Sequence, residues 1–181
     1  MVVVVHANVL FPLTLRDTML RAAAAGFYQL RWSAQILDEV ERNLVSTRTM
    51  ASDKAARLRA IMELHFPEAE VTGYAALVAG LRNDAKDRHV VAAAVKSGAQ
   101  VIATLNIRDF KPLPTGLEAW SPDEFLCHLF NLQPDAFTEM LREQASDLVR
   151  PPVTFDELLE RLGRVVPVLT SRVRQHRHAV R

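Results

Sequence analysis

Apolar residues occur along this chain in short runs and in helical repeats, and the two patterns alternate. Val2–Val5 is a run of β-branched residues, typical of a strand buried on both faces of a parallel sheet. Val101–Ala103 is a second such run, and Val71–Gly73 and Leu117–Trp120 are predicted as further short strands. The helical repeats predict helices over 13–25, 33–44, 52–65, 74–81 and 84–97, with 28–31 as a connector.

The strand signals end before Asn131, and only helices are predicted beyond it. Ser121-Pro-Asp-Glu and Thr154-Phe-Asp-Glu are capping boxes that each open a helix, and further helices are predicted over 134–149 and from Pro167 onward. Strands that alternate with helices indicate a parallel sheet with helices on both faces. We therefore expect residues 1–130 to form an α/β domain with four or five parallel strands, and residues 131–181 to add a helical extension with a basic tail.

The stretch from Asn83 to Phe110 carries acidic residues at a helix start and after a strand. Asp84 and Asp87 stand at or just before the first helical turn, where the helix dipole favours carboxylates. Asn106 and Asp109 follow the strand, and ligands bind at the carboxyl ends of strands in open α/β sheets. Taken alone, Asp84 and Asp87 are best explained as helix caps. If other carboxylates join them, the same residues predict a site.

Polar residues elsewhere are candidates for that site. His6 and Asn8 follow the first strand, so they belong to the carboxyl edge of the sheet. Glu39 lies beside Val40 on its helix, at the edge of the buried stripe. It is either a solvated boundary residue or a carboxylate that faces a cleft, and the sequence slightly favours the first interpretation.

Composition narrows the class of protein. The chain has 181 residues and a net charge of +1, which gives the whole molecule no strong attraction to nucleic acid. Its single cysteine, Cys127, excludes an internal disulfide and favours a reducing, cytoplasmic compartment. No apolar run approaches the length of a membrane span. From Arg161 to Arg181 there are six arginines and no acidic residue, which indicates a solvated end, an RNA-binding footprint or a docking arm.

Taken together, several segments resemble the PIN domain family of metal-dependent ribonucleases, especially the toxins of VapC-like modules. The resemblance rests on "HANVLFP" after the first strand, "RWSAQILDEVERNL", "NDAKDRHVVAAAVKSGAQVIATLNIRDF" and "WSPDEFL", which cover residues 1–130 in the family's order. It implies a three-layer α/β/α fold in which Glu39, Asp87 and Asp109 form an acidic cluster that binds Mg²⁺ or Mn²⁺. The supporting polar residues that it implies are Asn8, Asp84, Thr104 and Asn106.

One residue departs from the family pattern. The first strand of the family ends in aspartate, in an Asp-x-Asn arrangement, whereas this chain has His6. Mg²⁺ and Mn²⁺ prefer oxygen ligands, so we expect metal affinity to fall, and we expect the nearby carboxylates to raise the pKa of His6. His6 either silences a toxic nuclease, or is native to a site for Mn²⁺ or a transition metal, or marks a non-catalytic binding domain. We favour the silenced nuclease.

Three functions follow as hypotheses. The first is a PIN-type endoribonuclease, the toxin of a toxin–antitoxin pair, with catalytic residues His6, Glu39, Asp87 and Asp109 and with activity impaired by His6. The second is a degenerate PIN domain that binds RNA or protein, and the third is a structural α/β domain whose acidic residues are caps. For the first, the expected partners are an RNA substrate and an antitoxin protein, a homodimer stays open, and no membrane is involved.

Overall fold

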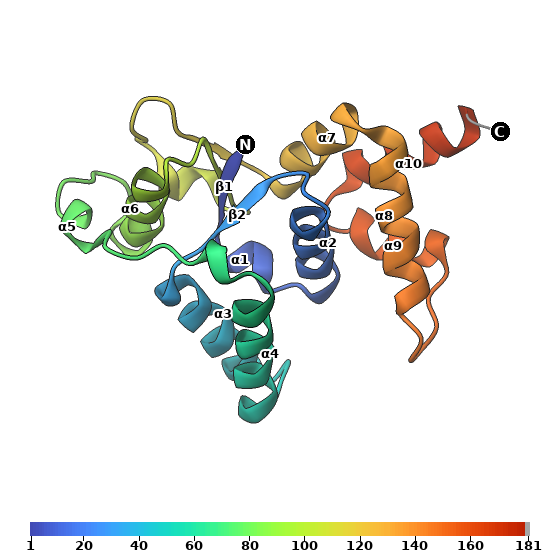
Figure 1. Ribbon diagram of the computed structural model, residues 1–181, viewed down its shortest axis with the longest axis horizontal. Coiled ribbons are helices and arrows are strands. Elements are labelled where there is room, and N and C mark those ends of the chain that lie inside the picture. Colours follow the sequence, from blue (N-terminus) through green and yellow to red (C-terminus); the bar gives the residue numbers. More distant parts are fainter. Residues whose placement is uncertain (180–181) are drawn as a thin grey trace. The chain divides into compact units, whose positions relative to one another are not determined.

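The computed structural model describes residues 1–179, which fall into two compact units (Figure 1). The sheet unit consists of residues 1–11 and 28–120, and the helical unit consists of residues 12–27 and those from Ser121 onward. The domain boundary after residue 130 stays a prediction. The compact units separate earlier, between Trp120 and Ser121, and the segment 12–27 joins the helical unit.

The sheet has four strands, all parallel, in the order β2-β1-β3-β4. The strands are β1 (Val2–Val5), β2 (Gln29–Arg31), β3 (Val101–Ala103) and β4 (Glu118–Trp120). Val3, Val4 and Val5 are fully buried, which is what a central strand covered on both faces requires. The prediction of a parallel α/β sheet with four or five strands is therefore confirmed.

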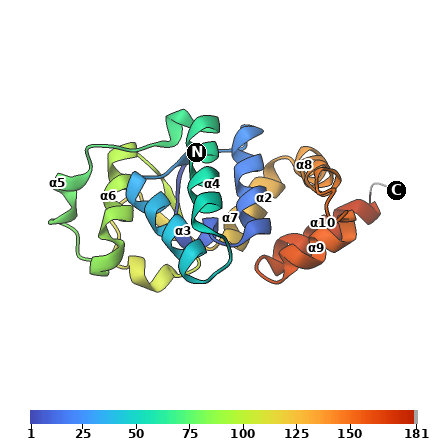
Figure 2. The same cartoon turned by 90° about the horizontal axis from the view of Figure 1, so that it is seen from below.

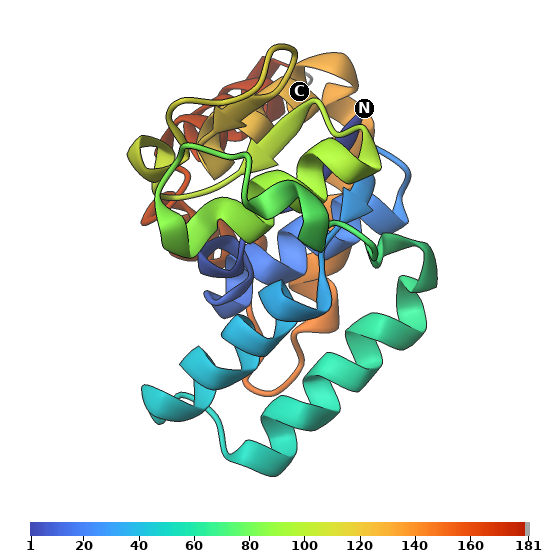
Figure 3. The same ribbon diagram turned by 90° about the vertical axis from the view of Figure 1, so that its left-hand side faces the viewer.

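Helices lie on both sides of this sheet, as in a three-layer α/β/α fold. Those of the sheet unit are α1 (Ala7–Leu10), α3 (Ala34–Ser46), α4 (Ser52–His65), α5 (Ala75–Val78) and α6 (Arg88–Ser97), with short 3₁₀ helices η1 (Pro67–Ala69), η2 (Ala85–Asp87) and η3 (Ile107–Phe110). α6 packs on β1 and β3, and α3 lies beside α4 (Figure 3). Ser33 caps α3 by accepting from the Ile36 amide, and Gly98 ends α6 at φ 66°.

Two local predictions are wrong. The segment predicted as a connector contains β2, which pairs with β1 in parallel, whereas Val71–Gly73 forms no strand. β2 is an edge strand of three residues in which only Leu30 is buried, so it lacks the apolar run of a central strand. The backbone near Val71 makes a single bridge, between Trp32 and Glu70, and Gly73 then turns the chain away at φ 69°.

The helical unit contains α2 (Leu13–Ala24), α7 (Pro122–Leu132), α8 (Pro134–Asp147), α9 (Phe155–Gly163) and α10 (Pro167–Ala179). α9 opens on the predicted capping box, because Thr154 and Glu157 exchange hydrogen bonds. α10 lies beside α9 (Figure 2). None of the helices within residues 1–179 combines the length and apolar character that a membrane crossing requires.

The basic tail is largely an ordered helix. α10 buries Leu169 and Val173, and the Asp123 carboxylate accepts from the Val168 and Leu169 amides at its start, at 3.0 and 2.9 Å. Of the tail arginines, Arg177 pairs with Asp156 at 2.8 Å. The apolar face of α10 thus docks within the helical unit, whereas Arg161, Arg164, Arg172 and Arg174 are exposed to solvent, so the three interpretations of the arginines stay predictions. Arg181 lies outside the described residues.

Candidate functional site

The carboxyl ends of the neighbouring strands β1 and β3 bring together two polar side chains. His6 follows β1 and Thr104 follows β3, and the His6 amide donates to the carbonyl of Ala103 at 3.0 Å. The His6 ring nitrogen Nδ1 and the Thr104 hydroxyl are 3.1 Å apart, and both side chains are buried. The sheet register therefore places His6 at the carboxyl edge, as predicted.

The other ring nitrogen of His6 faces two carboxylates. Its Nε2 lies 3.5 Å from Asp87 Oδ1 and 4.0 Å from Glu39 Oε2. Asp87 stands at the start of α6, and Glu39 is on α3 with its side chain 20% exposed. The interpretation of Glu39 as a solvated boundary residue is therefore wrong, because its carboxylate points towards His6. We call His6, Glu39, Asp87 and Asp109 the acidic cluster.

Asp84 and Asp87 have different roles, although both stand at a helix start. The Asp84 side chain caps η2 by accepting from the Lys86 amide at 3.1 Å. The Asp87 side chain makes no cap hydrogen bond and is buried. The interpretation as a helix cap thus fits Asp84 alone, and Asp87 is held in the protein interior beside His6.

Asp109 is held by three groups of the sheet unit. Its backbone carbonyl accepts from the Asp84 amide at 3.1 Å, which ties η3 to the start of η2. Its carboxylate accepts from the Asn106 side-chain amide and pairs with Lys86 Nζ at 2.6 Å. The Lys86 side chain is 64% exposed, so it brings a positive charge to the solvent side of the cluster.

Lys86 and His89 contact carboxylates of the acidic cluster but are not among the residues predicted from the sequence. His89 is buried at the start of α6, and its Nε2 lies 2.9 Å from Glu39 Oε1. The available signal was position, because both residues are within two places of Asp87. Neither residue type suggests an acidic site, since Lys and His at a helix start are usually solvated polar residues.

Burial is the main cause of the pKa shifts of His6 and Asp87. It lowers the pKa of His6 to about 4, against the attraction of Glu39, so the ring is neutral at pH 7. The expected rise is therefore wrong, because the cost of burying a charged imidazole exceeds the gain from nearby carboxylates. Burial also raises the pKa of Asp87 to about 6, and the charges of Asp109, Asp84 and Glu39 add to the rise against Lys86.

Buried polar atoms without a hydrogen-bond partner lie in the acidic cluster and in His89 beside it. They are Asp87 Oδ2 and both ring nitrogens of His89, whose Nε2 is at ion-pair distance from Glu39 but outside hydrogen-bond geometry. A divalent cation is the group that the sequence implies here. Within the described residues, however, no three His, Cys, Asp or Glu side chains are placed to hold a metal ion. As they stand, the residues do not fit Mg²⁺, because an imidazole faces the two carboxylates.

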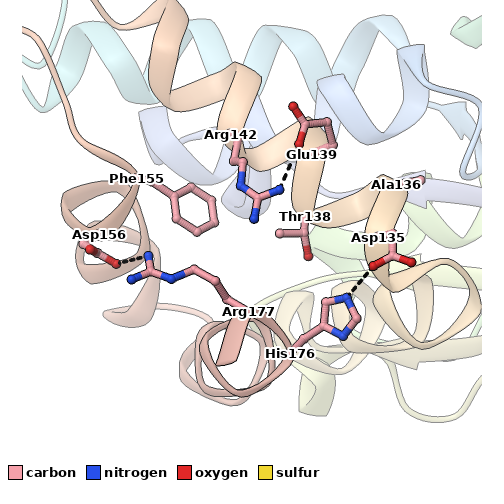
Figure 4. A pocket seen from close by; sticks show the side chains of 9 residues that line it. All are labelled: Asp135, Ala136, Thr138, Glu139, Arg142, Phe155, Asp156, His176 and Arg177. Carbon is pink, nitrogen blue, oxygen red and sulfur yellow. Dashed lines mark hydrogen bonds and ion pairs between the residues drawn. The ribbon is translucent and has the colours of Figure 1, made fainter. Parts of the chain in front are cut away.

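A separate cavity of about 810 Å³ belongs to the helical unit (Figure 4). Arg142 and Arg177 lie over the Phe155 ring, 5.7 and 6.0 Å from its centroid. Each arginine pairs with a carboxylate, and His176 pairs with Asp135 at 2.7 Å. The charged groups lining this cavity are thus matched, and none of the residues predicted for the site is among them.

The fold and the carboxylates at the sheet edge define an α/β domain of the PIN type. The family model described as "PIN domain" matches residues 2–108, and the chain belongs to this family. A second model, described as "VapC50 C-terminal domain", matches residues 122–175, which lie within the helical unit.

Among known proteins, the chain is similar to "Putative ribonuclease VapC50" of Mycobacterium tuberculosis. The two are 36% identical over 106 residues, which is 57% of this chain and 63% of the relative. The chain thus matches somewhat less than two thirds of that protein's length. No solved structure matches the chain.

Proposed function

We propose that this chain is a ribonuclease of the VapC type, the toxin half of a toxin–antitoxin pair, and that His6 keeps its cleavage activity low. Membership of the PIN family and the similarity to a protein named as a ribonuclease support the class of reaction. The proposed partners are an RNA substrate and an antitoxin protein, in a cytoplasmic setting that suits the single reduced cysteine.

The observation that carries the proposal is the set of carboxylates around His6. Glu39 comes from α3 and Asp87 from the start of α6, and the His6 ring contacts both. Asp109 adds a third carboxylate, whose charge acts on both His6 and Asp87. Carboxylates gathered from separate elements are expensive to bury unless they serve a function, so this arrangement favours a site over a set of helix caps.

His6 limits activity for an electrostatic reason. A phosphodiester is an anion, and it must approach three carboxylates to reach the acidic cluster. The His6 ring is neutral at pH 7 and offers the phosphate no full positive charge, and Lys86 reaches the cluster only from its solvent side. Cleavage adds negative charge to the phosphate in the transition state, which a single exposed lysine offsets only weakly. An aspartate at position 6 restores the carboxylate set that the PIN family uses with Mg²⁺ or Mn²⁺.

The test compares four proteins on a mixed-sequence RNA with Mg²⁺ or Mn²⁺: the native chain, His6→Asp, His6→Asn and His6→Asp with Asp87→Asn. We expect His6→Asp to cleave at least about 100-fold faster than the native chain, the order of effect seen when one electrostatic group is lost from an active site. His6→Asn removes the ring without adding a carboxylate and is the matched control, so it stays slow. Asp87→Asn should return the His6→Asp protein to the native rate.

Other results point elsewhere. Cleavage by the native chain as fast as by His6→Asp, with the double variant slow, makes His6 a working part of an active nuclease and contradicts the proposed impairment. Equal cleavage by all four proteins contradicts the site.

The second candidate is a degenerate PIN domain that binds RNA or protein without cleaving, and the neutral imidazole beside Asp87 and Glu39 favours it. It predicts that none of the four cleaves while RNA is still bound.

A further inference from the structure

A chain of hydrogen bonds at the sheet edge fixes which nitrogen of His6 carries the proton. The Leu105 amide donates to Asn8 Oδ1 at 3.1 Å, so the other end of that side chain is its NH₂ group. This group donates to Thr104 Oγ1 at 3.3 Å, and the Asn106 amide donates to the same oxygen at 3.1 Å. Both acceptor positions of the hydroxyl oxygen are then occupied.

The Thr104 hydroxyl has one hydrogen, and His6 Nδ1 is the partner 3.1 Å away that can receive it. Nδ1 is therefore an acceptor, and in a neutral ring the proton must be on Nε2. The backbone of residues 105 and 106 thus sets the tautomer of His6 through Asn8 and Thr104. This outcome needs no carboxylate, because it follows from counting donors and acceptors on the far side of the ring.

The Nε2–H group consequently points to the carboxylates. It lies 3.5 Å from Asp87 Oδ1 and 4.0 Å from Glu39 Oε2, where its positive hydrogen interacts with both. The ring is also held edge-on against Phe110, with 5.3 Å between ring centroids. A group fixed on three sides therefore faces the two carboxylates that would hold a cation.

Asp109 and the second oxygen of Glu39 also face nitrogen atoms of the chain. Asp109 pairs with Lys86 and accepts from Asn106, and Glu39 has His89 Nε2 at 2.9 Å from its second oxygen. Each of the three carboxylates thus faces a nitrogen of the protein. Asp87 Oδ2 is the buried carboxylate oxygen that no such group reaches.

We propose that the chain supplies its own counter-groups to the acidic cluster, with the His6 Nε2–H group in place of a divalent cation, so that the native domain folds and holds this site without metal. The proposal rests on the proposed function only in taking the acidic cluster as the place where a PIN nuclease binds its cation. It makes the His6→Asp protein cation-dependent, because four carboxylates then meet and the Nε2–H group that faced two of them is gone.

Thermal unfolding without RNA tests this proposal independently of cleavage. The native chain, His6→Asp and His6→Asn are each unfolded in EDTA and with Mg²⁺, Mn²⁺ or Zn²⁺. We expect the native chain to keep one midpoint in all buffers, His6→Asn to unfold below it in EDTA because the Nε2–H group is lost, and His6→Asp to unfold lowest in EDTA. Mn²⁺ about 100-fold above its Kd should then raise the His6→Asp midpoint by roughly 5 °C or more. A rise of that size in the native chain, removed by Asp87→Asn, overturns the proposal.

A second measurement on the native chain avoids variants that fail to fold. The ¹⁵N spectrum of the His6 ring at pH 7 reports which nitrogen is protonated, and we expect Nε2–H with Nδ1 as acceptor. Thr104→Val, which removes the hydroxyl donor, should lose this preference, whereas Thr104→Ser should keep it. An Nδ1–H tautomer or a fully protonated ring in the native chain contradicts the proposal. Absence of RNA cleavage by His6→Asp bears on the proposed function and leaves both measurements valid.

Discussion

The acidic cluster of the sheet unit and the charged cavity of the helical unit use similar side chains in opposite ways. In the cavity, Arg142 pairs with Glu139 and Arg177 with Asp156, and these groups are partly exposed. In the cluster, Asp87 is buried, its Oδ2 has no hydrogen-bond partner, and its pKa is raised to about 6. Matched, solvated charges contribute little to stability, whereas burying a carboxylate that faces only a neutral imidazole costs stability, a cost that is typical of functional sites.

Removing a charge should therefore have opposite effects in the two places. In the cluster, Asp87→Asn should stabilise the protein by about 1–3 kcal/mol at pH 7.5. The upper limit is the rise in pKa from 3.8 to about 6, at about 1.36 kcal/mol for each pKa unit. Urea unfolding of both proteins in EDTA measures this difference. A loss of stability in EDTA means that the carboxylate itself stabilises the fold and contradicts the comparison.

The pH dependence of that difference follows from the raised pKa of Asp87. Between pH 3.8 and about 6, the folded protein keeps a proton on Asp87 that the unfolded chain has released, so the native chain loses stability as pH rises through this window. The increase in unfolding free energy caused by Asp87→Asn should thus be complete above about pH 6.5 and absent below pH 3.8. The lowered pKa of His6, about 4, makes the stability of both proteins rise with pH, which opposes the effect of Asp87. The difference in unfolding free energy between the two proteins isolates Asp87, whereas either pH curve alone does not.

The matching change in the cavity should have the smallest effect. Asp156→Asn removes the carboxylate that holds Arg177 at 2.8 Å, on a side chain that is 67% exposed. We expect it to destabilise the protein by less than about 1 kcal/mol, because water and salt screen such pairs. Urea unfolding at low and high salt should show the loss shrinking as salt increases. A loss of several kcal/mol that salt does not change would remove the contrast between the two regions.

The sequence predicts most of the fold because its strongest signals are local. The run Val2–Val5, the Ser33 and Thr154 caps and Gly98 each specify structure through their own chemistry, and all are confirmed. The edge strand β2 is not predicted, because only one of its residues is buried and its sequence therefore lacks an apolar run. Val71–Gly73 was predicted as a strand from residue type alone.

The sequence names the candidate residues that the structure brings together, but their role as a site stays a prediction and their electrostatics could not be predicted. The resemblance to a family implies an acidic cluster of Glu39, Asp87 and Asp109 because these residues stand at positions that match the family's pattern. It does not weigh burial against charge, which is why the direction of the His6 pKa was wrong. Nor does it reveal His89 and Lys86 as contacts, because these depend on how η2 and α6 turn their first residues towards α3 and η3.

The most direct test of the account is to locate Mn²⁺ by its anomalous scattering in crystals of the native chain and of His6→Asp, each soaked at the same Mn²⁺ concentration. The account predicts a peak between the Glu39 and Asp87 carboxylates in His6→Asp and none at that position in the native chain, where the His6 ring stands. A peak of equal height at this position in the native chain would contradict the claim that the imidazole takes the place of the cation.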